Sequence, residues 1–256
     1  MASSTVKTLS QIATDVSACT MTTAWIMRKG IEMLDFGFYL MDCMEGMKKF
    51  PDDFFDLAIC DPPYGGVTRG GYMSNTSSVL ARNKDYHLSL WDMDKPDEKY
   101  FTELRRVSKN QIIWGGNYFA SLLSDSQGWI VWDKENGENH FADAELAWTS
   151  FDKATRIFRF RWQGMLQGDM KHKEIRIHPT QKPVALYKWL ISNFAKEGDI
   201  ILDTHVGSGS SLIACHNTNH KYVGFEIDET YYRLAKERID KETAQMNIFD
   251  FIGEKQ

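Results

Sequence analysis

The tetrapeptide Asp61-Pro62-Pro63-Tyr64 combines the groups in this sequence that are best suited to chemistry. It follows an apolar segment, residues 57–60, that we expect to be a strand covered on both faces. Two prolines fix φ and remove two backbone donors, so they predict a rigid turn that presents carbonyl oxygens. The Asp61 carboxylate and the Pro62 carbonyl could each accept one N–H of an exocyclic amine, while Tyr64 could stack on the ring that carries it. The simpler interpretation is a strand that ends in a proline turn with a capping aspartate.

A glycine-rich loop is the second candidate site. It consists of Asp203, Thr204, His205, Val206, Gly207, Ser208 and Gly209, between an apolar segment and an expected helix. Glycines let a backbone approach a ligand closely, and the start of a helix offers free N–H groups. The spacing fits neither a phosphate-binding P-loop nor a dinucleotide fingerprint. Glu226 ends the next expected strand, 23 residues after Asp203, and an acid at about that distance binds ribose in nucleoside-binding sheets. Loop and acid together predict a nucleoside cofactor without saying which one.

A third polar run, residues 178–183 (His-Pro-Thr-Gln-Lys-Pro), precedes an expected helix. Thr180 and Lys182 could bind a carboxylate near the start of that helix. A helix entry bounded by two prolines is the simpler interpretation, but it leaves the polar residues between them unexplained. His178 is expected to be structural, because no second metal ligand stands at a suitable spacing. The four cysteines show no Cys-x-x-Cys pair either, so no metal site is predicted.

The elements that must position these residues follow from the alternation of short apolar runs with helical patterns. This alternation predicts an α/β fold with a mostly parallel sheet. We expect strands at 38–41, 57–60, 111–114, 129–132, 145–149, 200–203 and 222–226, and helices at 97–107, 184–195, 210–217 and 230–241. Residues 31–256 are expected to form a single domain after a loosely specified extension, residues 1–30. Residues 65–90 and 152–177 lack periodicity and are expected to be a long loop and a short basic insert.

The charge distribution suggests a polyanionic partner. The chain has a formal net charge of −5, but residues 151–188 contain nine Lys and Arg and three Asp and Glu. This segment therefore carries +6 and leaves −11 on the rest of the chain. It is a plausible phosphate footprint, and a solvated loop is the alternative. No apolar stretch is long enough to span a membrane, residues 1–30 make a poor signal peptide, and the cysteine usage fits a reducing, cytoplasmic compartment.

Together, the three motifs resemble those of the DNA amino-methyltransferases. The order is that of the circularly permuted (beta) group, in which the catalytic motif precedes the glycine loop. The similarity extends from about Gly37 to Lys241, and the chain most resembles the small adenine-specific enzymes of phages and prokaryotes. The resemblance also covers segments 114–119, 128–134 and 145–148, which read WGGNYF, GWIVWDK and ELAW.

The resemblance implies S-adenosylmethionine as methyl donor, double-stranded DNA as partner, a flipped target base and a Rossmann-like sheet of seven strands, one of them antiparallel. By the same resemblance, the residues from Asp61 to Tyr64 are catalytic and Glu226 binds the ribose. Asp42 and Cys43 match positions near the cofactor adenine. The methionine part is matched by Asp203, His205, Gly207, Ser208 and Gly209 of the loop, and by Thr180 and Lys182. Thr204-His205 departs from the family's Pro-Phe or Pro-Tyr, so we expect cofactor binding to be weakened or tuned there.

Asp61 favours adenine N6 as the target by resemblance, although cytosine N4 is also an exocyclic amine and stays an alternative. Cytosine C5 methylation is rejected, because it needs a cysteine nucleophile, which usually follows a proline, and no cysteine does so here. A non-catalytic nucleic-acid-binding protein on the same fold is a rival, favoured by His205 alone. Methylation of RNA or of a protein amide is weakly disfavoured by Asp61. The recognition sequence, an association with restriction and a homodimer are left open.

Overall fold

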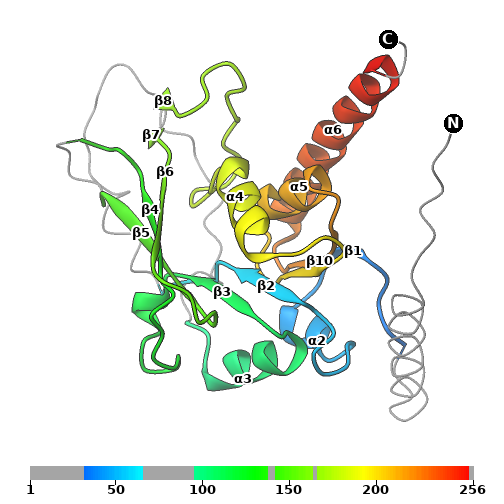
Figure 1. Cartoon of the computed structure of the whole chain (residues 1–256). Helices are drawn as coiled ribbons and strands as arrows, with labels where there is room; N and C mark the ends of the chain where they lie inside the picture. Colours follow the sequence, from blue (N-terminus) through cyan, green and yellow to red (C-terminus); the bar gives the residue numbers. More distant parts are fainter. Residues whose placement is uncertain (1–31, 66–94, 138–141, 164–165, 254–256) are drawn as a thin grey trace, which may run out of the picture.

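The computed structural model describes residues 32–65, 95–137, 142–163 and 166–253. The extension expected over residues 1–30 lies outside the described residues, as does nearly all of the loop expected over residues 65–90. What is described of the expected 31–256 domain is built around one large sheet with helices on both faces (Figure 1). No helix in these ranges has the length and apolar character needed to cross a bilayer.

The strands of the main sheet are β1 (Gly37–Leu40), β2 (Leu57–Cys60), β3 (Gln111–Trp114), β4 (Ile130–Asp133), β5 (Ala144–Thr149), β6 (Arg156–Arg159), β9 (Ile200–Asp203) and β10 (Lys221–Glu226). Their spatial order is β1-β10-β9-β2-β3-β5-β4-β6. β5 is antiparallel to both of its neighbours, and the other neighbouring pairs are parallel. The expected mostly parallel sheet with one antiparallel strand is therefore confirmed.

The main sheet contains eight strands where seven were expected, because β6 is added at the edge beside β4. Arg156 pairs with Ile130, and Arg159 with Asp133. Three of the four β6 side chains are exposed, so the strand lacks the apolar pattern that reveals a strand in sequence. The insert expected over 152–177 thus contributes an edge strand and a hairpin formed by β7 (Trp162–Gln163) and β8 (Leu166–Gln167).

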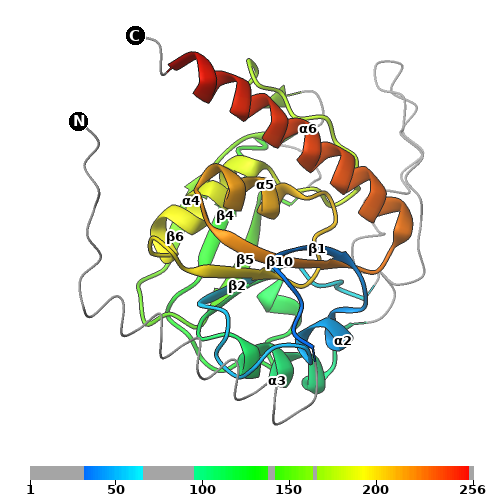
Figure 2. The ribbon, with the colours of Figure 1, turned by 90° about the vertical axis from the view of Figure 1, so that its right-hand side faces the viewer.

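Helices cover both faces of the sheet (Figure 2). α2 (Cys43–Met47) and α3 (Glu98–Val107) lie on one face, and α4 (Val184–Phe194), α5 (Ser210–Asn217) and α6 (Glu229–Gly253) lie on the other. Met47 and Leu104 are buried on the first face, and Leu186 and Leu190 on the second. Burying each such side chain contributes roughly 1.5–3 kcal/mol. Asp228 caps α6, since its Oδ1 accepts the Thr230 N–H at 2.9 Å.

The arrangement of β2 and β9 decides where a ligand can bind. The two strands are parallel neighbours. β2 leads on towards α3 on one face, whereas β9 leads into α5 on the other. Neighbouring strands whose connections leave in opposite directions open a crevice at their carboxyl ends, which is where open α/β sheets bind ligands. Asp61 follows β2 and the glycine loop follows β9, so the two main sequence motifs meet at this crevice.

Candidate active site

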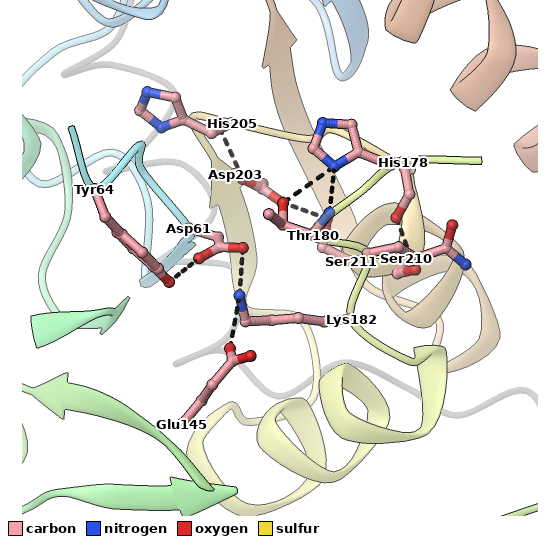
Figure 3. Close-up of polar contacts among 12 residues, drawn as sticks. Asp61, Tyr64, Glu145, His178, Thr180, Lys182, Asp203, His205, Ser210 and Ser211 are labelled. Atoms are coloured by element: carbon pink, nitrogen blue, oxygen red, sulfur yellow. Dashed lines mark hydrogen bonds and ion pairs between the residues drawn. The ribbon is translucent and has the colours of Figure 1, made fainter. Parts of the chain in front are cut away.

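Asp61 is held on both carboxylate oxygens at the carboxyl end of β2. Tyr64 Oη donates to its Oδ1 at 2.5 Å, and Lys182 Nζ contacts its Oδ2 (Figure 3). The side chain of Asp61 keeps 15% of its surface exposed, and Pro62 beside it is buried. Residues 61–64 all line one pocket. The turn expected from the two prolines therefore presents a fixed carboxylate to a cavity.

The ring of Tyr64 is contacted closely by the segment that follows β3. A Cβ built on Gly115 would lie 2.2 Å from Cε1 of Tyr64, so only a glycine fits beneath the ring. Tyr118 stacks on Tyr64 with ring centroids 4.9 Å apart and an interplanar angle of 26°. Tyr118 is 38% exposed, so an accessible aromatic surface stands next to the tetrapeptide.

The glycine loop turns sharply between β9 and α5. Gly207 and Gly209 have φ values of 55° and 80°, in the left-handed region that favours glycine. Arg238 of α6 supports the loop, because its Nη1 donates to the Ser208 carbonyl at 2.8 Å and contacts Ser210 Oγ at 2.9 Å. The loop is therefore fixed by its own turns and by a largely buried guanidinium.

Two acids line or support the loop, Asp203 at the end of β9 and Glu226 at the end of β10. Glu226 accepts the Gly207 N–H at 2.8 Å through Oε2 and the Asp228 N–H at 2.9 Å through Oε1. Asp203 accepts the His205 N–H at 2.9 Å and the hydroxyl of Ser211. Burial raises the pKa of Asp203 to about 7 and also raises the pKa of Glu226. Neither carboxylate is paired with a cationic side chain in the part of the chain that the structure describes.

His205, the departure from the family pattern, faces the same pocket. Its Nδ1 lies 2.9 Å from Thr204 Oγ1, which in turn lies 2.7 Å from Tyr100 Oη. The rings of Tyr100 and His205 meet edge to face at 5.5 Å. Burial lowers the pKa of His205 to about 4. At neutral pH the pocket is therefore lined here by an uncharged planar ring.

Residues 178–183 connect the two sides of the pocket. His178 lies at the glycine loop, since a Cβ on Gly207 would be 3.6 Å from its ring. Thr180 Oγ1 lies 3.1 Å from His178 Nδ1. Lys182 was expected to bind a ligand carboxylate. In the structure its ammonium instead contacts the carboxylates of Asp61 and, at 3.3 Å, of Glu145. His178 is buried and packs against Tyr231, as expected for a structural histidine.

Asp42 and Cys43 line the opposite part of the pocket, after β1. Asp42 Oδ1 accepts the backbone N–H groups of Met44 at 2.8 Å and Glu45 at 3.2 Å, so it caps α2. Burial raises the pKa of the Cys43 thiol to about 12, which keeps it neutral. The structure thus brings the residues expected from the sequence to one pocket or its immediate wall.

Three residues that contact the candidate site residues were not predicted from the sequence: Tyr118, Glu145 and Arg238. Tyr118 and Glu145 lie in segments that carry the family resemblance, but nothing in those segments indicates a contact with Tyr64 or Lys182. A glutamate in an otherwise apolar strand was the one available signal for Glu145. Arg238 is one basic residue among several on an amphipathic helix, and only the packing of α6 singles it out.

The basic segment 151–188 is only in part a free cationic surface. Arg156, Arg159 and Arg161 are exposed, as are Lys153, Lys171, Lys173 and Lys188. Lys182 is buried and ion-paired, so it does not belong to this surface. Arg176 is half-buried, stacks 4.9 Å from the Trp162 ring and donates to the Trp162 carbonyl. The usable footprint is therefore smaller than the count of charges indicated.

The fold and the pocket define a class, namely α/β proteins with a nucleoside-type ligand loop after one strand and a carboxylate-bearing proline turn after its neighbour. Comparison with known proteins is consistent with this class. Residues 123–237 match the family model described as DNA methylase, of the N6 and N4 amino-methyltransferases. The type II methyltransferase M.HpaI of Haemophilus parainfluenzae is 44% identical in an alignment of 254 residues. The alignment covers 84% of this chain and 76% of that protein.

A second relative, the type II methyltransferase M2.MboI of Moraxella bovis, is 25% identical over 242 residues, covering 80% of this chain and 87% of that protein. The solved structure of the cytosine-N4-specific PvuII DNA methyltransferase has the same fold, with a TM-score of 0.52 at 13% identity. The match covers 84% of this chain and 93% of that one. The chain belongs to the DNA amino-methyltransferase family.

Proposed function

We propose that the protein is a site-specific DNA adenine N6-methyltransferase that uses S-adenosylmethionine. The observation that carries the proposal is the meeting of two motifs in one pocket, which is lined by Asp61 through Tyr64 on one side and by the glycine loop and Glu226 on the other. An amine acceptor and a nucleoside site have to be adjacent for a methyl group to pass directly between them.

The residues present fit the proposed cofactor. S-adenosylmethionine carries a sulfonium and an ammonium, and Asp203 and Glu226 are buried acids without a cationic partner among the described residues. We assign Glu226 to the ribose, and Asp42 and Cys43 to the adenine. The methionine part falls to Asp203, His205, Gly207, Ser208 and Gly209, with Thr180 beside them. The neutral rings of His178 and His205 add no positive charge that would repel the sulfonium.

The proposed transfer needs a correctly oriented amine. When bound, the cofactor supplies an electrophilic methyl group. Asp61 and the Pro62 carbonyl each accept one N–H of the target amine, so the nitrogen lone pair is directed into the pocket. Tyr64 and the exposed ring of Tyr118 provide stacking for the flipped base, a contact contributing roughly 1–3 kcal/mol. Transfer is direct, without a covalent enzyme intermediate: the amine nitrogen gains the methyl group as the sulfur–methyl bond breaks, S-adenosylhomocysteine is the other product, and the methylated nitrogen afterwards releases one proton.

Adenine is the proposed target because position 61 is aspartate, which by family resemblance favours N6. Cytosine N4 is the second candidate, supported by the fold shared with the cytosine-N4-specific PvuII enzyme. DNA is proposed to contact the exposed arginines and lysines of segment 151–188 and the 65–90 loop. The relatives named type II methyltransferases support a role in restriction-modification. A homodimer stays a prediction.

Expression of the chain in a host without DNA methylation, followed by sequencing with modification detection, tests the proposal. We expect N6-methyladenine at one short motif, and no modification with Asp61→Ala. Glu237→Gln, an exposed change on α6, is the matched control and should leave methylation intact. N4-methylcytosine instead would support the second candidate. No methylation, together with no S-adenosylmethionine binding by calorimetry, would favour the non-catalytic rival.

A further inference from the structure

A buried ammonium stands beside Asp61. The side chain of Lys182 is 2% exposed, and its Nζ contacts Oδ2 of Asp61 and lies 3.3 Å from Oε2 of Glu145. It also lies 5.3 Å from the centre of the Trp114 ring. Burial alone would lower the pKa of Lys182, but the two carboxylates together raise it. An ammonium this deep is tolerable only when it is paired, so both carboxylates are needed to keep it there.

Glu145 is itself held by a second lysine. Its other oxygen, Oε1, contacts Lys134, which follows β4. Burial would raise the pKa of Glu145, but Lys182 and Lys134 outweigh it and lower the pKa to about 2. Trp132 of β4 pairs with Glu145 of β5 in the sheet. Lys134 lies two residues beyond Trp132, so the strand pair brings Lys134 close to Glu145.

The four side chains form a chain of alternating charge: Asp61, Lys182, Glu145 and Lys134. Its formal sum is zero, and Figure 3 shows Lys182 lying between the carboxylates of Asp61 and Glu145. The residues come from the tetrapeptide, the 178–183 run and the segments 128–134 and 145–148. Four segments that are far apart in the sequence therefore meet in one network of ion pairs.

The consequence for Asp61 is geometric. Lys182 occupies one lone-pair site on Oδ2, and Tyr64 occupies one on Oδ1. A carboxylate has about four such sites, so at least one site remains on each oxygen. Contacts to both oxygens fix the plane of the carboxylate and therefore the direction of the remaining sites, from which an amine N–H would be accepted.

We propose that Lys182, fixed by Glu145 and Lys134, is a positioning residue that orients the Asp61 carboxylate for methyl transfer. This inference rests on the proposed function. Lys182 acts through Asp61, and as an ammonium without a lone pair it cannot accept the proton that the target amine loses. If Lys182 instead bound the carboxylate of the cofactor, removing its charge would weaken cofactor binding. If Lys182 orients Asp61, the same change would leave cofactor affinity nearly unchanged.

The test compares Lys182→Met with Lys236→Met, a matched control at an exposed position of α6 outside the proposed DNA footprint. Calorimetry gives the Kd for S-adenosylmethionine, and transfer of its labelled methyl group to unmethylated bacterial DNA gives kcat. We expect kcat of Lys182→Met to fall about 100-fold, in line with the cost of a small misplacement, while the Kd changes less than about threefold. Lys182→Arg should recover part of kcat, and Glu145→Gln should lower kcat by about tenfold.

Lys182→Met leaves the network of four charged side chains with an unbalanced negative charge, which can destabilise the fold. The double variant Lys182→Met/Glu145→Gln is therefore measured as well. It removes one charge of each sign and is expected to fold and to show the same loss of kcat. The inference would be overturned if the variants kept the wild-type kcat, or if only their affinity for S-adenosylmethionine fell. Either result would leave the proposed function standing. An inactive wild-type protein would instead overturn the proposed function itself.

Discussion

Replacing Gly115 by alanine tests whether Tyr64 and Asp61 act as one unit. Gly115 has φ of 67°, and an added Cβ would lie 2.2 Å from Cε1 and 2.5 Å from Cζ of Tyr64. Ordinary contact requires more than a further ångström, so the ring has to move. Because Tyr64 Oη donates to Asp61 Oδ1, moving the ring also disturbs the carboxylate.

Three contributions lower the free energy of unfolding of the Gly115→Ala variant. A left-handed φ costs an alanine about 1–2 kcal/mol. Forcing Tyr64 off its rotamer costs about 0.5–1.5 kcal/mol, and a hydrogen bond to a charged group contributes about 1.5–3 kcal/mol. The free energy of unfolding should therefore fall by about 3–6.5 kcal/mol, and kcat by about 100-fold because the carboxylate is misplaced.

Gly137→Ala is the matched control for Gly115→Ala. Gly137 has the same φ of 67°, but no described atom lies within 4 Å of the added Cβ. We expect this variant to lose about 1–2 kcal/mol from backbone strain and to keep its kcat. Urea denaturation and the methyl-transfer assay measure the two quantities. Equal losses for the two variants would refute the coupling of Gly115, Tyr64 and Asp61.

Other predictions concern charge and pH. Burial raises the pKa of Asp203 to about 7, and a cationic cofactor favours the ionised form, so S-adenosylmethionine affinity should rise with pH up to about 7 in calorimetry and lose this dependence in Asp203→Asn. Burial lowers the pKa of His178 to about 4, so the neutral ring favours the fold above pH 6.5. Up to about 3 kcal/mol of that stability should be lost between pH 6.5 and pH 4, but not in His178→Gln. Arg238→Met should weaken cofactor binding through the Ser208 carbonyl, whereas the exposed Arg233→Met should not. Arg156→Ser should reduce the slope of log DNA affinity against log salt by about 0.9 if that side chain meets a phosphate, and an unchanged slope would remove it from the footprint.

The sequence predicted the strands that carry the site with small errors at their ends. β2, β3 and β9 begin and end where the apolar runs 57–60, 111–114 and 200–203 do, because strands buried on both faces are continuous apolar runs. β6 was missed for the opposite reason, since an exposed edge strand held by backbone pairing has no such run. The end of α6 was also missed, since the helix runs to Gly253 and not to the expected residue 241.

What the sequence by itself determined is the local chemistry: the rigid proline turn at Asp61, the left-handed glycines of the loop and the acid at the end of β10. These follow from short-range sterics and from residues that are neighbours in the chain. Only the tertiary structure decided that Lys182 pairs with Asp61 and Glu145, because residues 61, 145 and 182 are brought together by strands and a helix entry far apart in sequence. A buried charge takes its partners from whatever the packed fold places beside it, and charge patterns along a sequence do not record that choice.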